Sequence, residues 1–297
     1  MNIESLRIFC TVVEQNSISK AAQLHYVSQP SVTRLVRALE DFYGTALFER
    51  HENRLTITEA GRTLYSIAKT IVQDFDDSVE LMKSLQEKYQ FTLSVGASRG
   101  VGEYLLPKLL GDFKKMYPDA KITMKINTTD HIVEGVSQGI FHIGIVEGEF
   151  DYEAFHTEFL MEDELILIVG PMHRWATRKI IHFPEVIHEQ AIRRMANSEV
   201  RMRVEKELRK YNLLDKITSF IEFESTEAIK NAVEYGLGIS FVSRIAVEKE
   251  LAEGRLVEVA IRNVKITRPI YLITRKRRFP HAGISKFVQM IRDFRSV

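Results

Sequence analysis

The stretch Ser17–Phe42 reads SISKAAQLHYVSQPSVTRLVRALEDF and predicts two short helices that cross at an angle. Ser17 or Ser19 can cap the first helix, because either hydroxyl can accept a hydrogen bond from a free backbone N–H. We expect its buried face to be narrow enough for a second helix to cross close by; the face consists of Ala21, Ala22 and Leu24. Tyr26 and Val27 then form the turn.

The second helix should begin after Ser28, with Pro30 in its first turn, where a missing N–H costs nothing. Apolar residues then recur at helical spacing and should face the core: Val32, Leu35, Val36 and Leu39. The opposite face contains no acidic residue from Ser28 to Ala38. Its side chains suit nucleic acid, because Gln can pair with adenine, Arg with guanine and a hydroxyl with either.

This outer face could be the solvated side of an ordinary helix or a surface that contacts DNA. The narrow first helix, the short turn and the absence of acid agree with each other, and we favour the helix-turn-helix of a DNA-binding protein. The predicted contact residues on the second helix are Ser28, Gln29, Pro30, Ser31, Thr33, Arg34 and Arg37.

The flanking segments predict a winged helix-turn-helix. Residues 3–13 have the apolar pattern of a supporting helix, and Gly44 can end the second helix of the motif. A short hairpin is expected over residues 48–57, with Glu52 and Asn53 in its turn.

The charge of this first segment places its binding surface on one edge. Residues 1–60 hold six basic and seven acidic residues, so the domain is not basic overall. Arg50, His51 and Arg54 lie near the tip of the wing, where they could contact a phosphate or the minor groove; a charged solvated turn is the alternative. We add Arg50 and Arg54 to the DNA-binding set and expect two or more domains to bind together.

A long helix should follow Thr58, which can cap it. Its apolar positions have a mean spacing of 3.5 residues, the period of a coiled coil; they are Leu64, Ile67, Ile71, Phe75, Val79, Met82 and Leu85. So narrow a stripe predicts a dimerisation helix that spaces two DNA-binding domains. Packing against the chain's own C-terminal part is the competing interpretation.

Length and composition set the broad class. A chain of 297 residues predicts two or three domains, and its net charge of +1 hides the uneven distribution along the chain. Cys10 is the only cysteine, so no disulfide can form within the chain, and a buried core position is expected for it. Apolar runs such as Leu165–Val169 are too short to span a bilayer, and the N-terminus lacks an export pattern. We predict a cytoplasmic protein.

From Phe91 onward, predicted strands alternate with helices, which is typical of α/β folds with largely parallel sheets. A second block begins near Met161, and the last strand and helix, near residues 270–274 and 284–294, return to the first block. Two lobes joined by two crossings should leave a cleft between strand ends, the usual place for a small ligand.

One motif in this part suggests an enzyme. The residues Gly96–Gly100 match G-x-S-x-G between a strand and a helix, as in a hydrolase nucleophile elbow. No oxyanion-hole motif precedes it, and Asp215 and His281 are easy to find by chance. We therefore interpret Ser98 as a hydroxyl at a helix N-terminus that binds a polar ligand. A serine hydrolase fused to a helix-turn-helix remains the alternative function.

Other residues suggest cofactors less strongly. A dinucleotide loop at Gly100–Gly102 fails because its third glycine position is Leu105. His182, Glu185 and His188 have the residue types of metal ligands, but Pro184 interrupts their helix. We predict no enzyme activity, no cofactor and no metal.

Together these features resemble the LysR-type transcriptional regulators, over essentially the whole chain. The most specific part is LRIFCTVVEQNSISKAAQLHYVSQPSVTRLVRALEDFYGTALFER with LTITEAG, within the first sixty-one residues. The resemblance implies a bacterial homodimer or homotetramer that binds promoter DNA, with RNA polymerase as a further partner. It also implies a C-terminal domain similar to type 2 periplasmic binding proteins, with a small effector between two lobes.

Carried across, the resemblance places effector contacts on both lobes; the predicted set is Ser98, Arg99, Gly100, Thr128, Glu147, Ser198 and Thr226. Many relatives have G-S-G-T before the helix of the second lobe, where this chain has Asn197–Val200, and Glu147 stands where a neutral hydroxyl is common. Two carboxylates, Glu147 and Glu199, disfavour a simple anion unless Arg99, Arg193 or Arg194 neutralises them.

The predicted fold is therefore multidomain. Residues 1–58 form an all-α winged helix-turn-helix, 59–89 a linker helix, and 90–297 a two-lobed α/β effector domain. Lobe I covers about 90–161 and 267–297, and lobe II covers about 162–266.

Overall fold

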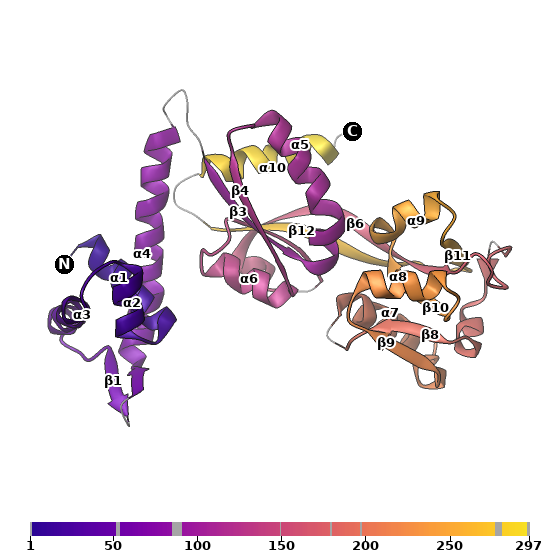
Figure 1. Ribbon diagram of the computed structural model, residues 1–297, viewed down its shortest axis with the longest axis horizontal. Coiled ribbons are helices and arrows are strands. Elements are labelled where there is room, and N and C mark those ends of the chain that lie inside the picture. Colours follow the sequence, from indigo (N-terminus) through magenta and orange to yellow (C-terminus); the bar gives the residue numbers. More distant parts are fainter. Residues whose placement is uncertain are drawn as a thin grey trace. The chain divides into compact units, whose positions relative to one another are not determined.

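The computed structural model describes residues 2–51, 54–84, 91–148, 150–178, 180–196, 198–276 and 281–295 (Figure 1). The chain divides into two compact units, Met1–Phe91 with Arg277–Ser285, and Thr92–Lys276 with Lys286–Val297. The predicted domain boundary near residue 90 and the seam residue Leu85 lie outside the described residues. No helix among those described is long and apolar enough to cross a bilayer.

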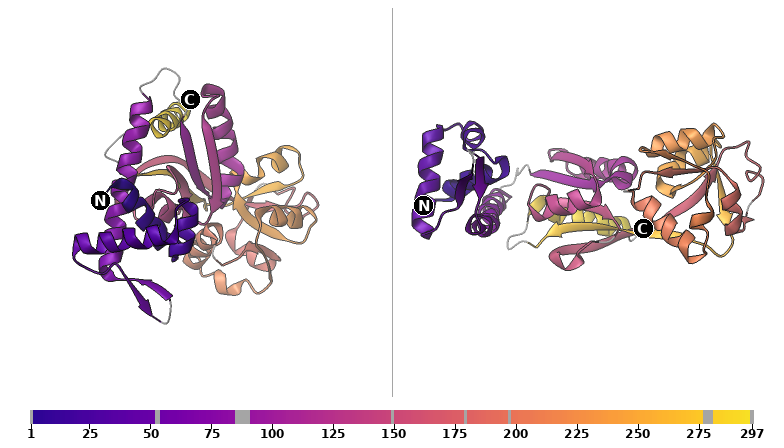
Figure 2. Two further views of the ribbon diagram at one scale, coloured as in Figure 1. Left: turned by 60° about the vertical axis from the view of Figure 1, so that its left-hand side comes forward. Right: turned by 90° about the horizontal axis from the view of Figure 1, so that it is seen from below.

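The N-terminal unit is a helical domain with a β-hairpin, and Figures 1 and 2 show the hairpin projecting beyond the helices. Its elements are α1 (Ile3–Gln15), α2 (Ile18–Leu24), α3 (Gln29–Tyr43), β1 (Phe48–His51), β2 (Arg54–Ile57) and α4 (Glu59–Ser84). The strands pair antiparallel, with His51 opposite Arg54. The predicted turn residues Glu52 and Asn53 lie outside the described residues.

The predicted helix caps are confirmed. The hydroxyl of Ser17 accepts a hydrogen bond from the backbone N–H of Lys20 at 3.2 Å, and that of Ser28 from Ser31 at 3.3 Å. Tyr26 has a φ of +54°, a left-handed conformation that turns the chain between α2 and α3. These local interactions determine where α2 and α3 begin and how the motif turns.

One predicted core position is wrong. Ala21 and Ala22 are buried, but the side chain of Leu24 is 57% exposed. Successive helical residues are rotated by about 100°, so Leu24, at the last position of the short α2, is turned away from the face that Ala21 and Ala22 share.

The core of the N-terminal unit lies between α1, α3 and α4. Phe9, Leu39 and Leu64 belong to one buried cluster, which also contains Cys10, as predicted. Burial raises the pKa of the Cys10 thiol to about 11. The protonated, enclosed thiol therefore serves as a small apolar core residue.

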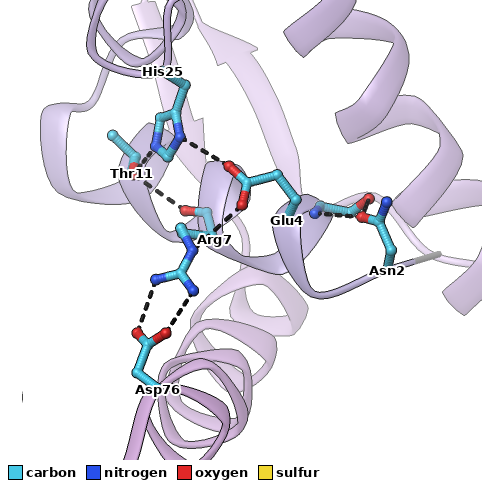
Figure 3. Close-up of polar contacts among 7 residues, drawn as sticks. Asn2, Glu4, Arg7, Thr11, His25 and Asp76 are labelled. Atoms are coloured by element: carbon cyan, nitrogen blue, oxygen red, sulfur yellow. Dashed lines mark hydrogen bonds and ion pairs between the residues drawn. The ribbon is translucent and has the colours of Figure 1, made fainter. Parts of the chain in front are cut away.

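Polar contacts tie α1 to both α4 and the end of α2 (Figure 3). The guanidinium of Arg7 donates two hydrogen bonds to the carboxylate of Asp76 on α4, at 2.8 and 2.7 Å. The ring of His25 lies 3.2 Å from the carboxylate of Glu4 and 2.7 Å from the hydroxyl of Thr11. The hydrogen bonds to Asp76 hold the pKa of Arg7 above its usual value. The long helix is thus held to α1 by charge as well as by apolar packing.

The second unit has two lobes, which Figure 1 shows joined by long strands. Lobe I contains β3 (Thr92–Ser98), a π-helical turn (Val101–Leu105), α5 (Leu106–Met116), β4 (Lys121–Asn127), α6 (Thr129–Ser137), β5 (Ile143–Glu147) and a 3₁₀ turn (Tyr152–Ala154). The C-terminal helix α10 (Ala282–Arg295) brings Phe287 against Phe113 of α5, with ring centroids 5.1 Å apart. The predicted return of the last helix to the first block is confirmed.

Lobe II contains the remaining short elements. They are β7 (Ile180–Ile181), β8 (Ala191–Arg194), α7 (Glu199–Lys210), β9 (Phe220–Phe223), α8 (Thr226–Glu234), β10 (Ile239–Ser243), α9 (Glu248–Ala252) and β11 (Val257–Ile261), with 3₁₀ turns at Phe183–His188, Leu214–Lys216 and Arg244–Val247. Two apolar clusters cover the faces of its strands; Trp175 is in one and Ile229 in the other.

Two long strands, β6 (Phe155–Val169) and β12 (Ile266–Arg275), run through both lobes. The strand order is β4-β3-β5-β12-β6-β10-β8-β9, with β11 beside β6. Pairing is parallel within each lobe, between β3 and its neighbours and between β8 and its neighbours, but β6 and β12 pair antiparallel with each other and with β10 and β5. The expectation of largely parallel sheets therefore holds only within the lobes.

The crossing strands also differ from their predicted lengths. The apolar run Leu165–Val169 covers only the last five residues of β6, because charged residues interrupt the apolar pattern where the strand leaves lobe I. A register shift opposite Ile270 and Tyr271 leaves Leu160 without a direct partner on β12. This bulge lies at the point where the sequence predicted the second block to begin.

Candidate functional site

The outer face of α3 is the surface expected for DNA. Gln29, Arg34 and Arg37 are exposed, while Ser31 and Thr33 are half-buried. No carboxylate in the described part of the chain pairs with either arginine. Both guanidinium groups are therefore available to a phosphate or a base edge.

Hydrogen bonds within the motif already order some of the predicted contact residues. The hydroxyl of Ser19 on α2 donates to the side-chain carbonyl of Gln29 at 3.1 Å, and that of Thr33 donates to the backbone carbonyl of the same residue. The hydroxyls of Ser28 and Ser31 lie 2.8 Å apart. The structure describes the backbone of Arg50, His51 and Arg54 but not their side chains, so their role in the wing stays a prediction.

The second candidate site is a cavity of about 160 Å³ between lobes I and II. All seven residues predicted for the effector line it: Ser98, Arg99, Gly100, Thr128, Glu147, Ser198 and Thr226. Ser98 and Glu147 end parallel strands of lobe I, and Ser198 and Thr226 lie where helices of lobe II begin. The carboxyl ends of strands and the starts of helices thus face one space, the usual position of a ligand in open α/β folds.

Two of the hydroxyls in this cavity are available for a ligand. The side chain of Ser98 is 2% exposed, and its hydroxyl has no hydrogen-bond partner among the residues that the structure describes. Ser198 precedes α7, but its side chain makes no capping hydrogen bond. The hydroxyl of Thr128, in contrast, lies 2.8 Å from the ring of His131. A buried polar group without a partner costs free energy, so the cavity favours a ligand that bonds to it.

At the floor of the cavity lies a buried network of ion pairs and hydrogen bonds that the sequence analysis did not predict. Arg268 on β12 lies 2.8 Å from a carboxylate oxygen of Glu147 and 2.8 Å from one of Asp163 on β6. The second oxygen of Asp163 accepts a hydrogen bond from the hydroxyl of Ser243 in lobe II. This network therefore extends from the end of β5 in lobe I, across both crossing strands, to the end of β10 in lobe II.

The sequence does contain a signal for this network of ion pairs. Arg268 and Asp163 interrupt apolar strands at positions that the structure pairs directly across β6 and β12. A charged residue within a buried strand needs a partner, but a single sequence does not reveal which one. Burial raises the pKa of Glu147, and Arg268 only partly offsets that effect.

Glycines leave room for these charged groups. A Cβ at Gly100 would lie 3.2 Å from a guanidinium nitrogen of Arg268, and one at Gly148 would lie 2.9 Å from the carboxyl carbon of Glu199. Gly148 also has a φ of +95°, which other residues rarely adopt.

Glu199 pairs with Arg203 at 2.9 Å on the same helix. Asn197, in the predicted departure from the family pattern, lies outside the described residues.

The two neighbouring arginines of β8 point in opposite directions, as alternating strand residues do. Arg194 lines the cavity and donates a hydrogen bond to the hydroxyl of Thr226 at 2.7 Å. Its Nε atom is buried and has no hydrogen-bond partner within the described ranges. Burial and the nearby charge of Arg99 lower the pKa of Arg194. Arg193 lies outside the cavity, where its guanidinium pairs with Glu222 at 2.9 Å.

Comparison with known proteins identifies the chain. A family model described as bacterial regulatory helix-turn-helix protein, lysR family, matches residues 3–62, and one described as LysR substrate binding domain matches residues 86–296. The chain belongs to the LysR family. It is a DNA-binding transcriptional regulator with an effector domain, and the predicted fold class is confirmed.

Relatives of similar length support this assignment. A probable RuBisCO transcriptional regulator of Cyanidioschyzon merolae is 31% identical, with 97% of each chain covered. One of Cyanidium caldarium is 34% identical, over 97% of this chain and 92% of its own. Among solved structures, full-length OxyR from Pseudomonas aeruginosa superposes with a TM-score of 0.75 at 22% identity, covering 98% of this chain and 95% of its own. CbnR in complex with its target DNA gives 0.64 at 21% identity, covering 99% of each chain.

The described residues around Ser98 of this LysR-family chain do not support the hydrolase alternative. An activated serine needs a base within hydrogen-bond distance, and the described part of the chain places none beside the hydroxyl of Ser98. Asp215 lies in an exposed turn that does not line the cavity, and the ring of His281 accepts a hydrogen bond from the backbone N–H of Ile284.

Other predicted functional residues also have structural roles. Glu185, which resembled a metal ligand, accepts hydrogen bonds from Arg178 and from the backbone of His182. On α4 the predicted seam is exposed at Ile67, Ile71, Phe75, Val79 and Met82. The prediction that Leu64 belongs to the seam is wrong, because its side chain is only 6% exposed and packs in the core of its own domain. The face of α4 that carries Leu64, Ala68 and Val72 packs into the core of the domain, so the available seam begins at Ile67.

Proposed function

We propose that this LysR-family regulator binds its operator as a dimer and responds to a small polar effector in the interlobe cavity. The cavity carries the proposal, because seven residues from segments far apart in the sequence converge there. Unpartnered buried groups such as the hydroxyl of Ser98 support a ligand at this place.

For DNA, we assign base contacts to Gln29 and Arg34 on α3, and phosphate contacts to Arg37 and to Arg50 and Arg54 in the wing. The exposed, unpaired guanidinium groups of Arg34 and Arg37 support this division. Only base contacts distinguish one sequence from another, whereas phosphate contacts position the domain.

For assembly, we assign the exposed seam of α4 to a partner helix from a second copy. Five apolar side chains at helical spacing stay exposed in the single chain, which supports a dimer or a tetramer made from dimers. Such an assembly would hold two recognition helices at successive half-sites. RNA polymerase is the partner through which a cytoplasmic regulator of this kind would act on transcription.

For control, we assign the effector to a closed state of the two lobes. Tyr104 of lobe I already donates a hydrogen bond to Glu227 of lobe II at 2.8 Å, so closure brings polar groups together across the cavity. A ligand that binds only the closed form shifts the population toward it. The change in lobe geometry would then alter the spacing of the recognition helices in the dimer.

The test begins with the full-length protein and its own genome. Immunoprecipitated promoter fragments identify the operator, and mobility shifts on that operator are then repeated with fractions of a metabolite extract. A RuBisCO promoter is a useful additional probe, since the relatives carry that name. We expect specific retardation that one fraction changes. Retardation that no fraction alters would favour a regulator that works without a ligand and would contradict the effector assignment.

A further inference from the structure

The charged groups that line the cavity, or pair directly with a lining residue, are unbalanced at two separate places. At the first, one guanidinium faces two carboxylates: Arg268 pairs with both Glu147 and Asp163, and all three side chains are almost completely buried. One oxygen of Glu147 and the Nη1 atom of Arg268 are buried and have no hydrogen-bond partner among the described residues. This end of the cavity therefore has one negative charge in excess and an acceptor that lacks a donor.

At the second place the imbalance is reversed. No carboxylate in the described part of the chain lies within 4 Å of the Arg194 guanidinium, whose Nε atom is a buried donor without an acceptor. Arg99 adds a second positive charge nearby, and its nearest acidic partner, Glu224, is 3.9 Å away and largely exposed. The carboxylates of Glu103 and Glu224 act on Arg194 from a distance, but neither pairs with it, so this end has a guanidinium without a direct counter-charge and a donor that lacks an acceptor.

We propose that the effector is a small amino acid in its zwitterionic form, with its ammonium group at Glu147 and its carboxylate at Arg194. This inference rests on the proposed function, which places an effector in the cavity. The ammonium donates to the unpartnered oxygen of Glu147 and to the hydroxyl of Ser98. The carboxylate accepts from the Nε atom of Arg194, which Thr226 already holds in place.

Other small ligands would leave one end uncompensated. A simple dianion would meet the carboxylate of Glu147, and a simple amine would leave the guanidinium of Arg194 without a counter-charge, both at a cost in free energy. Burial is the main cause of the raised pKa of Glu147 and of the lowered pKa of Arg194, and the like charges of Asp163 and Arg99 add to the two shifts. A volume of about 160 Å³ is below the range of pockets for drug-sized molecules, which favours a small ligand.

The decisive experiment measures binding of defined compounds to the full-length wild-type protein. Thermal shift identifies hits among the protein amino acids and β-alanine, and titration calorimetry gives their affinities. For each hit, two analogues are compared: the 2-hydroxy acid, which lacks the ammonium, and the decarboxylated amine, which lacks the carboxylate. Each missing charged hydrogen-bonding group should weaken binding roughly tenfold to hundredfold.

Two variants test which end of the cavity binds the ammonium group and which binds the carboxylate. Arg194→Gln should abolish the advantage of the amino acid over its decarboxylated amine, and Glu147→Gln should abolish its advantage over the 2-hydroxy acid. Arg193→Gln is the matched control, because it removes the same charge from the next residue of β8, outside the cavity. If Glu147→Gln does not fold, the comparison of analogues on the wild type still decides.

The outcomes separate this inference from the proposed function. Stabilisation by sulfate, phosphate or succinate, lost in Arg194→Gln, would overturn the zwitterion and leave an effector cavity in place. Equal binding of an amino acid and either analogue would also overturn it, as would the absence of any hit in the panel. The proposed function fails only if no fraction of a metabolite extract alters operator binding.

Discussion

Arg34 lies exposed on α3 without an acidic partner, in the position of a side chain that distinguishes bases. Arg34→Ala should weaken binding to the specific operator by about 1–3 kcal/mol, because a bidentate contact to a base is lost. Mobility shifts with operator and random DNA measure the difference. Equal losses on both DNAs would contradict a base contact at this residue.

Arg50 provides the comparison, since a contact from the wing to a phosphate carries no sequence information. Arg50→Ala should weaken binding to all sequences alike and lower the slope of log affinity against log salt by about one unit. A salt titration of both variants separates the two kinds of contact. An unchanged slope would remove Arg50 from the set of phosphate contacts.

Glu147 should make the stability of the second unit depend on pH. Burial raises its pKa in the folded state, so the folded protein binds this proton more tightly than the unfolded chain does. Its contribution to the free energy of unfolding therefore increases as pH falls through the raised pKa toward the ordinary glutamate value of about 4.3. Denaturant unfolding from neutral to acidic pH should show this increase in the wild type and not in Glu147→Gln. Parallel curves for the two proteins would contradict the assignment.

The residues of the two sites were predictable to different degrees. The caps at Ser17 and Ser28 and the hydroxyl of Ser98 follow from local pattern, because hydroxyl groups at helix starts have few alternative roles. Arg268 and its carboxylates were not predictable, since a buried ion pair depends on which strands become neighbours. Leu24 failed for a different reason, because its side chain is rotated on α2 away from the face that Ala21 and Ala22 share.

The exposed stripe of α4 gives the next prediction. Ile71→Asp with Phe75→Asp should dissociate the dimer, because each would bury a carboxylate without a partner against the second helix. Sedimentation measures the mass, and operator binding should fall with it. Ser66→Asp with Thr70→Asp is the control, as both residues are exposed on the same helix outside the stripe. An intact dimer in the first variant would show that the stripe contacts something else.

The contact between α1 and α4 can be tested independently of dimerisation. Asp76→Asn should reduce the free energy of unfolding of the N-terminal unit by about 1 kcal/mol, because its double hydrogen bond with Arg7 is weakened. A double-mutant cycle with Arg7→Met isolates the pair. Additive effects would mean that the two side chains do not stabilise each other.

Among the elements, helices with caps and strands with uninterrupted apolar runs were predicted well, and the crossing strands were not. β6 combines an apolar half with a half rich in charged residues, so its pattern suggests a shorter strand. Its length depends on β12, which pairs with it from a distance of about a hundred residues along the chain. Leu64 shows the same limit, because the 3.5-residue pattern of α4 continues from a core contact into an exposed stripe without a visible break.

In the complete regulator, the cavity and the DNA-binding surface should be separable by mutation. Ser98→Ala should abolish the response to the effector while the affinity of the free protein for its operator stays unchanged, because Ser98 lies in the second unit and α3 in the first. Reporter assays and mobility shifts on the same variant provide the two measurements. Loss of operator binding would point to misfolding, and an unchanged response would remove Ser98 from the site.

The pairing of β6 with β12 has a mechanical consequence for such a response. Ten residues of β12 pair with β6 across the junction of the lobes, so the lobes are joined by a continuous two-stranded ribbon. A ribbon of this kind resists in-plane bending and yields more readily to twisting. Its softest point is the bulge at Leu160, where the ladder is interrupted. We therefore expect the lobes to rotate relative to each other about the ribbon axis. The twisted ribbon should then relax and reopen the cavity once the ligand leaves.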